Sequence, residues 1–319
     1  MHPSASDTWF GTSDLPWPQA AVAGRLASVP ELAELPRQVV RLSGGLTNVN
    51  LRVSTPAGSF VARLYSSDGA LLAIDRDAEF HNSAAAATAG VGAPVVAYRP
   101  GEAMLVVGFL PGRTYTAEDL ADHQNLTRVA RACRQLHEGP RFQGDFDMFQ
   151  IQSRYYATVR ERGFRLPARY DEFLPQVARI REALKVQDVG TVPCNNDLLA
   201  GNFIDDGNKI WLIDYEYSGN NDACFELGNV WSESTLGLNE LEHLVTAYYG
   251  RHLRNRIARA RLLGLVSKYG WTLWASIQDG SSTLDFDFWE WGMEKYDRAV
   301  SEFDGPHFEQ LLDEAARDD

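Results

Sequence analysis

The segment PCNNDLLAGNF, residues 193 to 203, carries an acid, Asp197, and an amide, Asn202, and the next strand, KIWLID, ends at a second acid, Asp214. Carboxylate and amide oxygens suit Mg²⁺, which keeps several waters and also binds substrate phosphates. If Asn202 and Asp214 hold such an ion, the carboxylate of Asp197 is free to accept a hydrogen bond from an attacking hydroxyl. This division of roles is typical of phosphoryl transfer.

A β-hairpin is predicted to bring these three side chains together. NFIDD and KIWLID pair across Gly207 and Asn208, two residues that tolerate the positive φ of a tight turn. The loop that enters the hairpin carries the acid and the amide, and the loop that leaves it carries the second acid. The three oxygen-bearing groups should therefore converge.

The N-terminal third predicts a small antiparallel sheet. Apolar residues alternate over 39–42, 49–54 and 60–65, with Gly, Asn and Pro between these strands. A helix should follow over 75–92, because the segment is rich in alanine, begins with acidic residues and has Gly90 near its end. Two further strands are predicted over 93–98 and 103–110.

Beyond LPGR, 110–113, the pattern changes to long amphipathic helices. The first is predicted over 117–139, with Thr116 and Asp119 as its cap. The others are predicted over 152–164, 171–186, 224–236, 239–250, 254–279, 287–303 and 307–317. The expected fold class is α+β, with a β-rich N-terminal lobe over 1–108 and a larger, mainly helical lobe over 109–319.

Composition excludes several classes of protein. The 319 residues are 45% hydrophobic, which is ample for a core, and the net charge of −13 argues against nucleic-acid binding. The three cysteines follow no metal or disulfide spacing and are predicted to be reduced, buried thiols. With no apolar run long enough for a membrane span and no signal-like start, the protein is predicted to be cytoplasmic. The basic stretch 251–263 is expected to be the solvated face of a helix, with a partner surface as the alternative.

Eight motifs occur in one order along the chain: GGLTN, FVARLY, GFLPGR, CNNDLLAGN, LIDYEY, FELGN, WTLWASIQ and FDFWEW. In this order they resemble the choline/ethanolamine kinase family, whose protein-kinase-like fold is shared with aminoglycoside phosphotransferases. The resemblance runs from about Leu42 to Asp297. It implies a bilobal fold, ATP and Mg²⁺ as cofactors, and transfer of a phosphoryl group to the hydroxyl of a small molecule.

The resemblance also implies a nucleotide site. Its residues would be the phosphate-covering loop of Gly44, Gly45, Thr47 and Asn48, the phosphate contact Arg63 with its ion-pair partner Glu79, and the hinge of Gly108, Phe109 and Leu110, whose backbone would meet adenine. Taken alone, the two glycines are as well explained by a plain turn, the glutamate by a solvated helix surface, and the hinge by any interdomain turn.

For the other half of the site, the resemblance implies Asp197 as the base or hydroxyl-orienting group, Asn202 and Asp214 as Mg²⁺ ligands, and Glu216 as an outer-shell metal or substrate contact. An aromatic box for a trimethylammonium group would be formed by Tyr217, Trp271, Trp274 and Trp291, with Glu233 lining the same cleft. Ordinary core packing is the alternative for such an aromatic stripe. Asp285 and Asp287 would raise the local negative potential or cap a helix.

One residue departs from the family pattern. Asn195 stands where the family usually has His, and an amide can hydrogen-bond but cannot carry positive charge. Choline is the first expectation for the acceptor, ethanolamine or an aminoglycoside is the alternative within the same fold, and a catalytically silent nucleotide-binding module is the alternative from another class. The oligomeric state and the role of residues 1–35 are left open.

Overall fold

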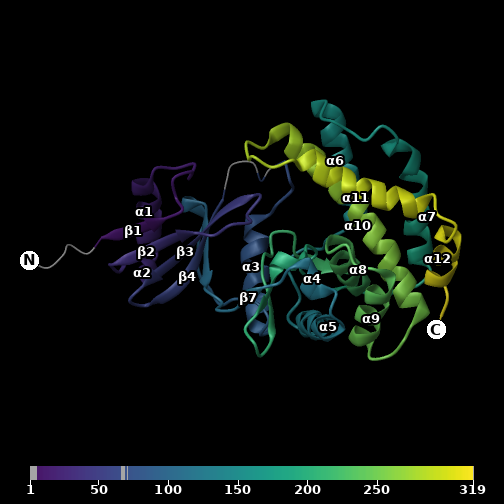
Figure 1. Ribbon diagram of the computed structural model, residues 1–319, viewed down its shortest axis with the longest axis horizontal. Coiled ribbons are helices and arrows are strands. Elements are labelled where there is room, and N and C mark those ends of the chain that lie inside the picture. Colours follow the sequence, from purple (N-terminus) through teal and green to yellow (C-terminus); the bar gives the residue numbers. More distant parts are fainter. Residues whose placement is uncertain (1–5, 66–68, 70, 319) are drawn as a thin grey trace, which may run out of the picture.

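The computed structural model describes residues 6–65, 69 and 71–318, and its N-terminal part is a six-stranded sheet (Figure 1). Its strands lie in the order β1-β2-β3-β4-β6-β5. They are β1 (Asp7–Phe10), β2 (Arg37–Arg41), β3 (Asn48–Thr55), β4 (Gly58–Tyr65), β5 (Val95–Arg99) and β6 (Met104–Gly108). The five predicted strands are confirmed. The sixth, β1, was not predicted; it pairs parallel with β2, and an ion pair of 2.6 Å joins Asp7 to Arg37.

Two short helices, α1 (Gln19–Ala27) and α2 (Pro30–Ala33), pack on this sheet. Val22, Leu26 and Leu32 are fully buried in one cluster with sheet residues such as Leu51 and Val53. Burial of these aliphatic side chains supplies the hydrophobic free energy that holds the N-terminal segment on the sheet. Part of residues 1–35 is therefore integral to the N-terminal core.

Helix α3 (Arg76–Thr88) links the sheet to the rest of the molecule, as Figure 1 shows. The carboxylate of Asp75 caps it by accepting backbone N–H groups of Asp77 and Ala78, and Gly90 takes a left-handed φ of 80° after its end. The predicted helix is thus confirmed. Asn82 donates from Nδ2 to the carbonyl of Ser218, which ties α3 to the C-terminal part.

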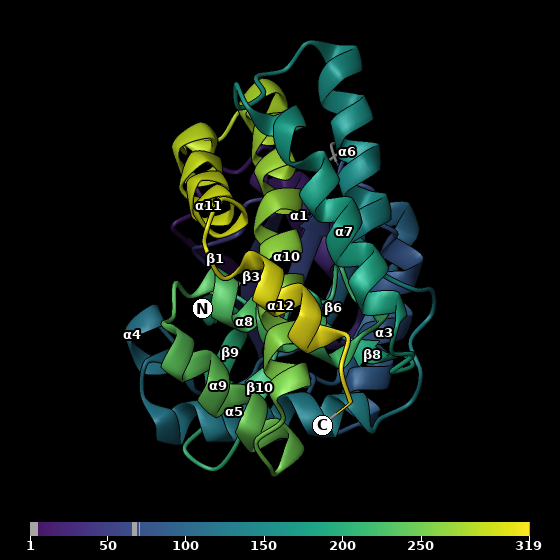
Figure 2. The same ribbon diagram turned by 90° about the vertical axis from the view of Figure 1, so that its right-hand side faces the viewer.

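The C-terminal part is mainly helical, and α10 runs through its middle (Figure 2). Its helices are α4 (Ala117–Leu120), α5 (His123–His137), α6 (Met148–Arg162), α7 (Leu174–Lys185), α8 (Ala223–Glu233), α9 (Leu238–Tyr249), α10 (Arg254–Ser281), α11 (Phe288–Phe303) and α12 (Phe308–Ala315). The prediction of one helix over 117–139 was wrong, because Asp122 caps a new helix by accepting the Gln124 N–H at 2.7 Å. The capping box of Thr116 and Asp119 is confirmed.

The basic stretch 251–263 is only in part the solvated helix face that was expected: Arg254 is exposed, whereas Arg259 is buried. Arg259, on the central helix α10, is 7% exposed and makes an ion pair of 2.5 Å with Asp222.

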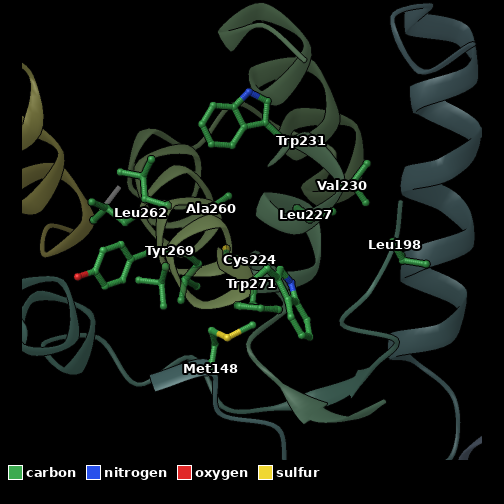
Figure 3. Packing of buried hydrophobic residues seen from close by; sticks show 14 of the residues in the cluster. Met148, Leu198, Cys224, Leu227, Val230, Trp231, Ala260, Leu262, Tyr269 and Trp271 are labelled. Atoms are coloured by element: carbon green, nitrogen blue, oxygen red, sulfur yellow. The ribbon is translucent and has the colours of Figure 1, made fainter. Parts of the chain in front are cut away.

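Helix α8 approaches α10 so closely that a Cβ at Gly228 would overlap the carbonyl oxygen of Ala260. Figure 3 shows the apolar side chains around this contact, among them Leu227 and Val230 of α8.

Short β-elements carry the loops of interest. The predicted hairpin is confirmed as β9 (Phe203–Asp205) and β10 (Ile210–Leu212), with Gly207 at a φ of 87°. Strand β8 (Val192–Cys194) pairs with β11 (Gly219–Asn221), and β7 (Arg113–Thr114), which follows the predicted hinge, pairs with β9. The lobe boundary at residue 108 stays a prediction.

All three cysteines are buried and free, as predicted. Among the helices of residues 6–65, 69 and 71–318, none is both long enough and apolar enough to cross a bilayer.

Candidate active site

The two loops that flank the β9–β10 hairpin are held together by a chain of hydrogen bonds. Asn202 donates from Nδ2 to the carbonyl of Asp197 at 2.7 Å, and the Ile213 N–H donates to the carbonyl of Asn202 at 3.1 Å. Asp214 follows at once, in a left-handed conformation with φ of 66°. Such a backbone conformation costs a non-glycine residue about 1 kcal/mol or more and is concentrated at functional sites. The structure thus brings the three predicted side chains onto adjoining loops.

Asn195, the departure from the family pattern, joins the same two loops. Its Nδ2 donates to the carbonyls of Ile213 and Asp214 at 3.1 and 2.9 Å, and its Oδ1 accepts the Asp197 N–H at 3.1 Å. A neutral amide satisfies both a donor and an acceptor role here, so it holds the loops without positive charge.

Asn195→Ala is therefore expected to lower kcat by about tenfold and to destabilise the fold by about 1–2 kcal/mol, because two partly buried carbonyls lose their donor. Activity assays and urea unfolding of the variant measure the two effects. Asn195→His serves as the control, since an imidazole N–H can replace one of these bonds. An alanine variant with unchanged kcat would show that loop positioning does not depend on this side chain.

Glu226 of α8 holds the loop that enters the hairpin by hydrogen bonds to its backbone. This residue was not predicted from the sequence. It is fully buried, and its carboxylate accepts the N–H groups of Asn195 and Asn196 at 3.0 and 2.7 Å. Asn196 has a φ of 68°, so the loop turns sharply where the carboxylate holds it. The signal in the sequence is an acid inside the apolar run FELGNVW, which needs a buried partner.

Arg63 of β4 lies at the centre of a charged cluster. Its guanidinium is 2.5 Å from Asp214, 3.1 Å from Glu216 and 3.1 Å from Glu79. The contact with Glu79 of α3 is the ion pair expected from the sequence, whereas the two contacts with the second loop were not predicted. An inward cation on an apolar strand thus joins the sheet to the hairpin region.

Glu216 is bound from the other side by the glycine-containing segment. Thr47 donates from Oγ1 to Glu216 Oε1 at 2.7 Å, and Asn48 donates from Nδ2 to Oε2 at 2.8 Å. Arg76, which sequence reasoning missed, lies 3.1 Å from Glu216 and 2.8 Å from Glu79. Burial alone would raise the pKa of Glu216, but Arg63 and Arg76 outweigh it, so the pKa lies below its usual value. Glu216 is ionised and contacts the segment of the expected nucleotide loop.

The backbone of that segment depends on its glycines. Gly44 has a φ of 98°, and a Cβ on Gly45 would lie 2.5 Å from the carbonyl oxygen of Asn48. The expected hinge begins where β6 ends, with Gly108 donating its N–H to Pro94 and Phe109 donating to Ser59. Leu110, the third expected hinge residue, is 9% exposed.

The carboxyl of Asp197 lies in a strongly acidic environment. Burial raises its pKa well above the usual value, and the negative charges of Glu233, Asp214 and Glu216 raise it further. The pKa of this carboxyl is thus higher in the folded state than in the unfolded chain, where it is about 4. The free energy of unfolding therefore falls as pH rises from about 4 through the folded-state pKa.

Asp197→Asn is accordingly expected to raise Tm by about 2–4 °C at pH 8 without metal or nucleotide, because it removes an unfavourable charge. The difference should shrink toward pH 4, where the wild-type carboxyl is protonated. Calorimetric scans of both proteins across this range test the sign. Asp313→Asn, at an exposed position of α12, is the control.

The predicted aromatic residues form one cluster. Trp274 donates its indole N–H to the Tyr217 hydroxyl at 2.9 Å, and its ring meets that of Trp291 edge-on at a centroid distance of 5.4 Å. Trp271 meets Tyr217 edge-on at 4.9 Å and is labelled in Figure 3. Asp287 accepts the Glu290 N–H at 2.9 Å, which confirms the helix-capping interpretation of that acid.

Glu233, at the end of α8, connects this cluster to the acidic loops. Among the charged groups it raises the pKa of Asp197 most. Its carboxylate is 2.5 Å from Nζ of Lys295, a buried lysine of α11 that sequence reasoning did not single out. Nζ of Lys295 also lies 4.1 Å from the centroid of the Trp291 ring, so this ion pair joins α8 to the aromatic cluster.

A two-part fold with this arrangement of acids, amide and inward arginine is that of the protein-kinase-like phosphotransferases. A choline/ethanolamine kinase family protein from Mesorhizobium loti superposes with a TM-score of 0.82 at 28% identity, covering 93% of this chain and 99% of its own. The aminoglycoside 2'-phosphotransferase-IIIa in its GDP complex gives a TM-score of 0.62 at 12% identity over 89% of this chain and 99% of its own, which shows a shared fold.

The family model described as Choline/ethanolamine kinase matches residues 39–249, more than half of the chain. The chain belongs to the choline/ethanolamine kinase family. Rat ethanolamine kinase 2 is 31% identical over 145 residues, which span 39% of this chain and 37% of the rat protein. A probable ethanolamine kinase of Arabidopsis thaliana is 24% identical over 288 residues, 78% of this chain and 75% of its own.

Proposed function

We propose that this protein transfers the γ-phosphoryl group of ATP, with Mg²⁺, to the hydroxyl of a small amino alcohol. The observation that carries the proposal is the convergence of Asp197, Asn202 and Asp214 on two hydrogen-bonded loops opposite Arg63. Family membership supports the same reaction class.

ATP is assigned to the junction between the lobes over 1–108 and 109–319. Gly44, Gly45, Thr47 and Asn48 would cover the phosphates, and Gly108, Phe109 and Leu110 would meet adenine. Arg63, held by Glu79, would turn from the carboxylates toward the phosphates when nucleotide is bound. The solved complexes of related folds with AMP and GDP support the binding of a nucleotide.

The donor set fits Mg²⁺. Asn202 uses its Nδ2 for the bond to the Asp197 carbonyl, so its amide oxygen is the atom available to a metal, and Asp214 supplies a carboxylate. Metal bound by these two oxygens would offset charge on the β- and γ-phosphates. Glu216, bonded to Thr47, is assigned as an outer contact of the same region.

Asp197 would accept a hydrogen bond from the acceptor hydroxyl and so orient it for direct in-line attack on the γ-phosphorus. No covalent enzyme intermediate is needed, because the P–O bond to ADP breaks as the bond to the hydroxyl oxygen forms. The hydroxyl proton leaves toward the Asp197 carboxylate.

Two acceptors are candidates. The indole and phenol rings of Tyr217, Trp271, Trp274 and Trp291 support choline, because π faces attract a quaternary ammonium that has no N–H to donate. The carboxylate of Glu233 supports ethanolamine, because its buried Oε1 accepts no hydrogen bond from the described residues and suits an N–H donor.

Incubation with ATP and Mg²⁺ and detection of products by ³¹P NMR tests the proposal. Choline, ethanolamine and a panel of aminoglycosides are supplied separately. A phosphomonoester signal from either amino alcohol supports it. Nucleotide binding without any phosphorylated product would favour the catalytically silent module, and aminoglycoside phosphate alone would move the function to the related antibiotic kinases.

A further inference from the structure

Lys295 places a buried cation on one wall of the aromatic cluster. It lies one turn after Trp291 on α11 and is 6% exposed. Its Nζ is 4.1 Å from the centroid of the Trp291 ring and 2.5 Å from Glu233 Oε2. The ammonium group therefore already makes, within the protein, both the cation–π contact and the ion pair that a substrate ammonium would seek.

The second oxygen of the same carboxylate is differently placed. Glu233 Oε1 is buried and, within the described part of the chain, has no hydrogen-bond partner. A buried acceptor without a donor costs free energy, so a ligand that brings an N–H is favoured there. The charge of Glu233 raises the pKa of Asp197, the proposed hydroxyl-orienting group, and the charge of Lys295 lowers it.

These two contacts favour the binding of a primary ammonium group over that of a quaternary one. A trimethylammonium has no hydrogen to offer Oε1, and one face of the Trp291 ring is already covered by Nζ. A primary ammonium is smaller by three methyl groups and can donate an N–H to the free oxygen.

We propose that Lys295 is a specificity-determining residue, which by covering Trp291 and holding one oxygen of Glu233 makes the site prefer ethanolamine to choline. The inference rests on the proposed function and deepens it. Lys295 does not touch the reacting atoms; it acts by deciding which surfaces of the cluster remain for the acceptor.

Lys295→Met is the direct test, since methionine keeps an apolar stem of similar length and removes the ammonium. The wild type is expected to have a higher kcat/KM for ethanolamine than for choline. The variant should move the ratio of the two toward choline by about tenfold or more, mainly through the KM of the amino alcohol, with the KM of ATP unchanged. An unchanged ratio would overturn the inference.

Three further variants make the outcome specific. Lys295→Arg keeps the charge and should keep the preference for ethanolamine. Lys209→Met is the matched control, because Nζ of Lys209 also lies over a tryptophan ring, 3.5 Å from the Trp211 centroid, on the β9–β10 hairpin, and it should leave the ratio within about threefold. If Lys295→Met does not fold, Lys295→Gln removes the charge but keeps an N–H donor for Glu233 Oε2, and it should also move the ratio toward choline.

Direct binding separates this inference from the proposed function. Titration of intrinsic tryptophan fluorescence with choline and with ethanolamine reports the ratio of Kd values without any turnover. Absence of turnover with both amino alcohols would count against the proposed function alone, and the ratio of Kd values would still decide the role of Lys295. A Lys295→Met ratio equal to that of the wild type in binding overturns the inference.

Discussion

Asp197→Ala is expected to lower kcat for the amino alcohol by about 10²–10⁴-fold while ATP binding is retained, because the variant loses the group that orients the hydroxyl and accepts its proton. The carboxylate suits this role because its pKa, raised by burial and by the charge of Glu233, makes it a stronger base than an ordinary carboxylate. Steady-state rates measured with saturating ATP and Mg²⁺ give the size of the loss.

Two comparisons make this result interpretable. Calorimetric titration with an ATP analogue should give nearly the wild-type Kd for Asp197→Ala, which separates lost chemistry from lost folding. Asp206→Asn, in the exposed turn of the same hairpin, should leave the rate unchanged. An alanine variant that turns over at near the wild-type rate would remove Asp197 from the mechanism.

Asp214→Ala should lower kcat/KM by about 10²–10³-fold and raise the Mg²⁺ concentration needed for half-maximal rate. The variant loses a carboxylate ligand of Mg²⁺, and the metal stabilises the phosphate charge in the transition state by several kcal/mol. The substitution also removes the carboxylate that lies 2.5 Å from Arg63. Rates measured over a wide range of Mg²⁺ concentrations separate the two effects, because only a weakened metal site is rescued by excess Mg²⁺.

Asp214→Glu offers the matched comparison. It keeps the charge that Arg63 contacts but lengthens the side chain, so it should retain the ion pair and still require more Mg²⁺. If Asp214→Ala keeps the wild-type Mg²⁺ dependence, the metal is not held by this residue.

Local sequence patterns predicted most of the secondary structure. The five predicted strands of the N-terminal sheet followed from the alternation of apolar residues. The alanine-rich helix followed from its acidic first turn and from Gly90 near its end, and all these signals act within a few residues. The hairpin around Gly207 was predicted for the same reason, and with it the convergence of the flanking loops. The roles of the converging residues remain predictions until the variants are measured.

What the sequence did not predict depends on partners far apart in the chain. Strand β1 is only four residues long and is defined by pairing with β2 and by the contact of Asp7 with Arg37. Arg259 looked like a surface cation because its partner, Asp222, lies on another element. Lys295 could not be singled out for the same reason, since Glu233 is close in space and distant in sequence.

The most direct test of the central claim is a crystal structure with a non-hydrolysable ATP analogue, Mg²⁺ and ethanolamine. The account predicts a metal bound by the Asn202 amide oxygen and the Asp214 carboxylate at about 2.0–2.1 Å, with the acceptor hydroxyl within about 3.2 Å of the Asp197 carboxylate. A nucleotide whose phosphates and metal lie away from these three side chains would contradict it.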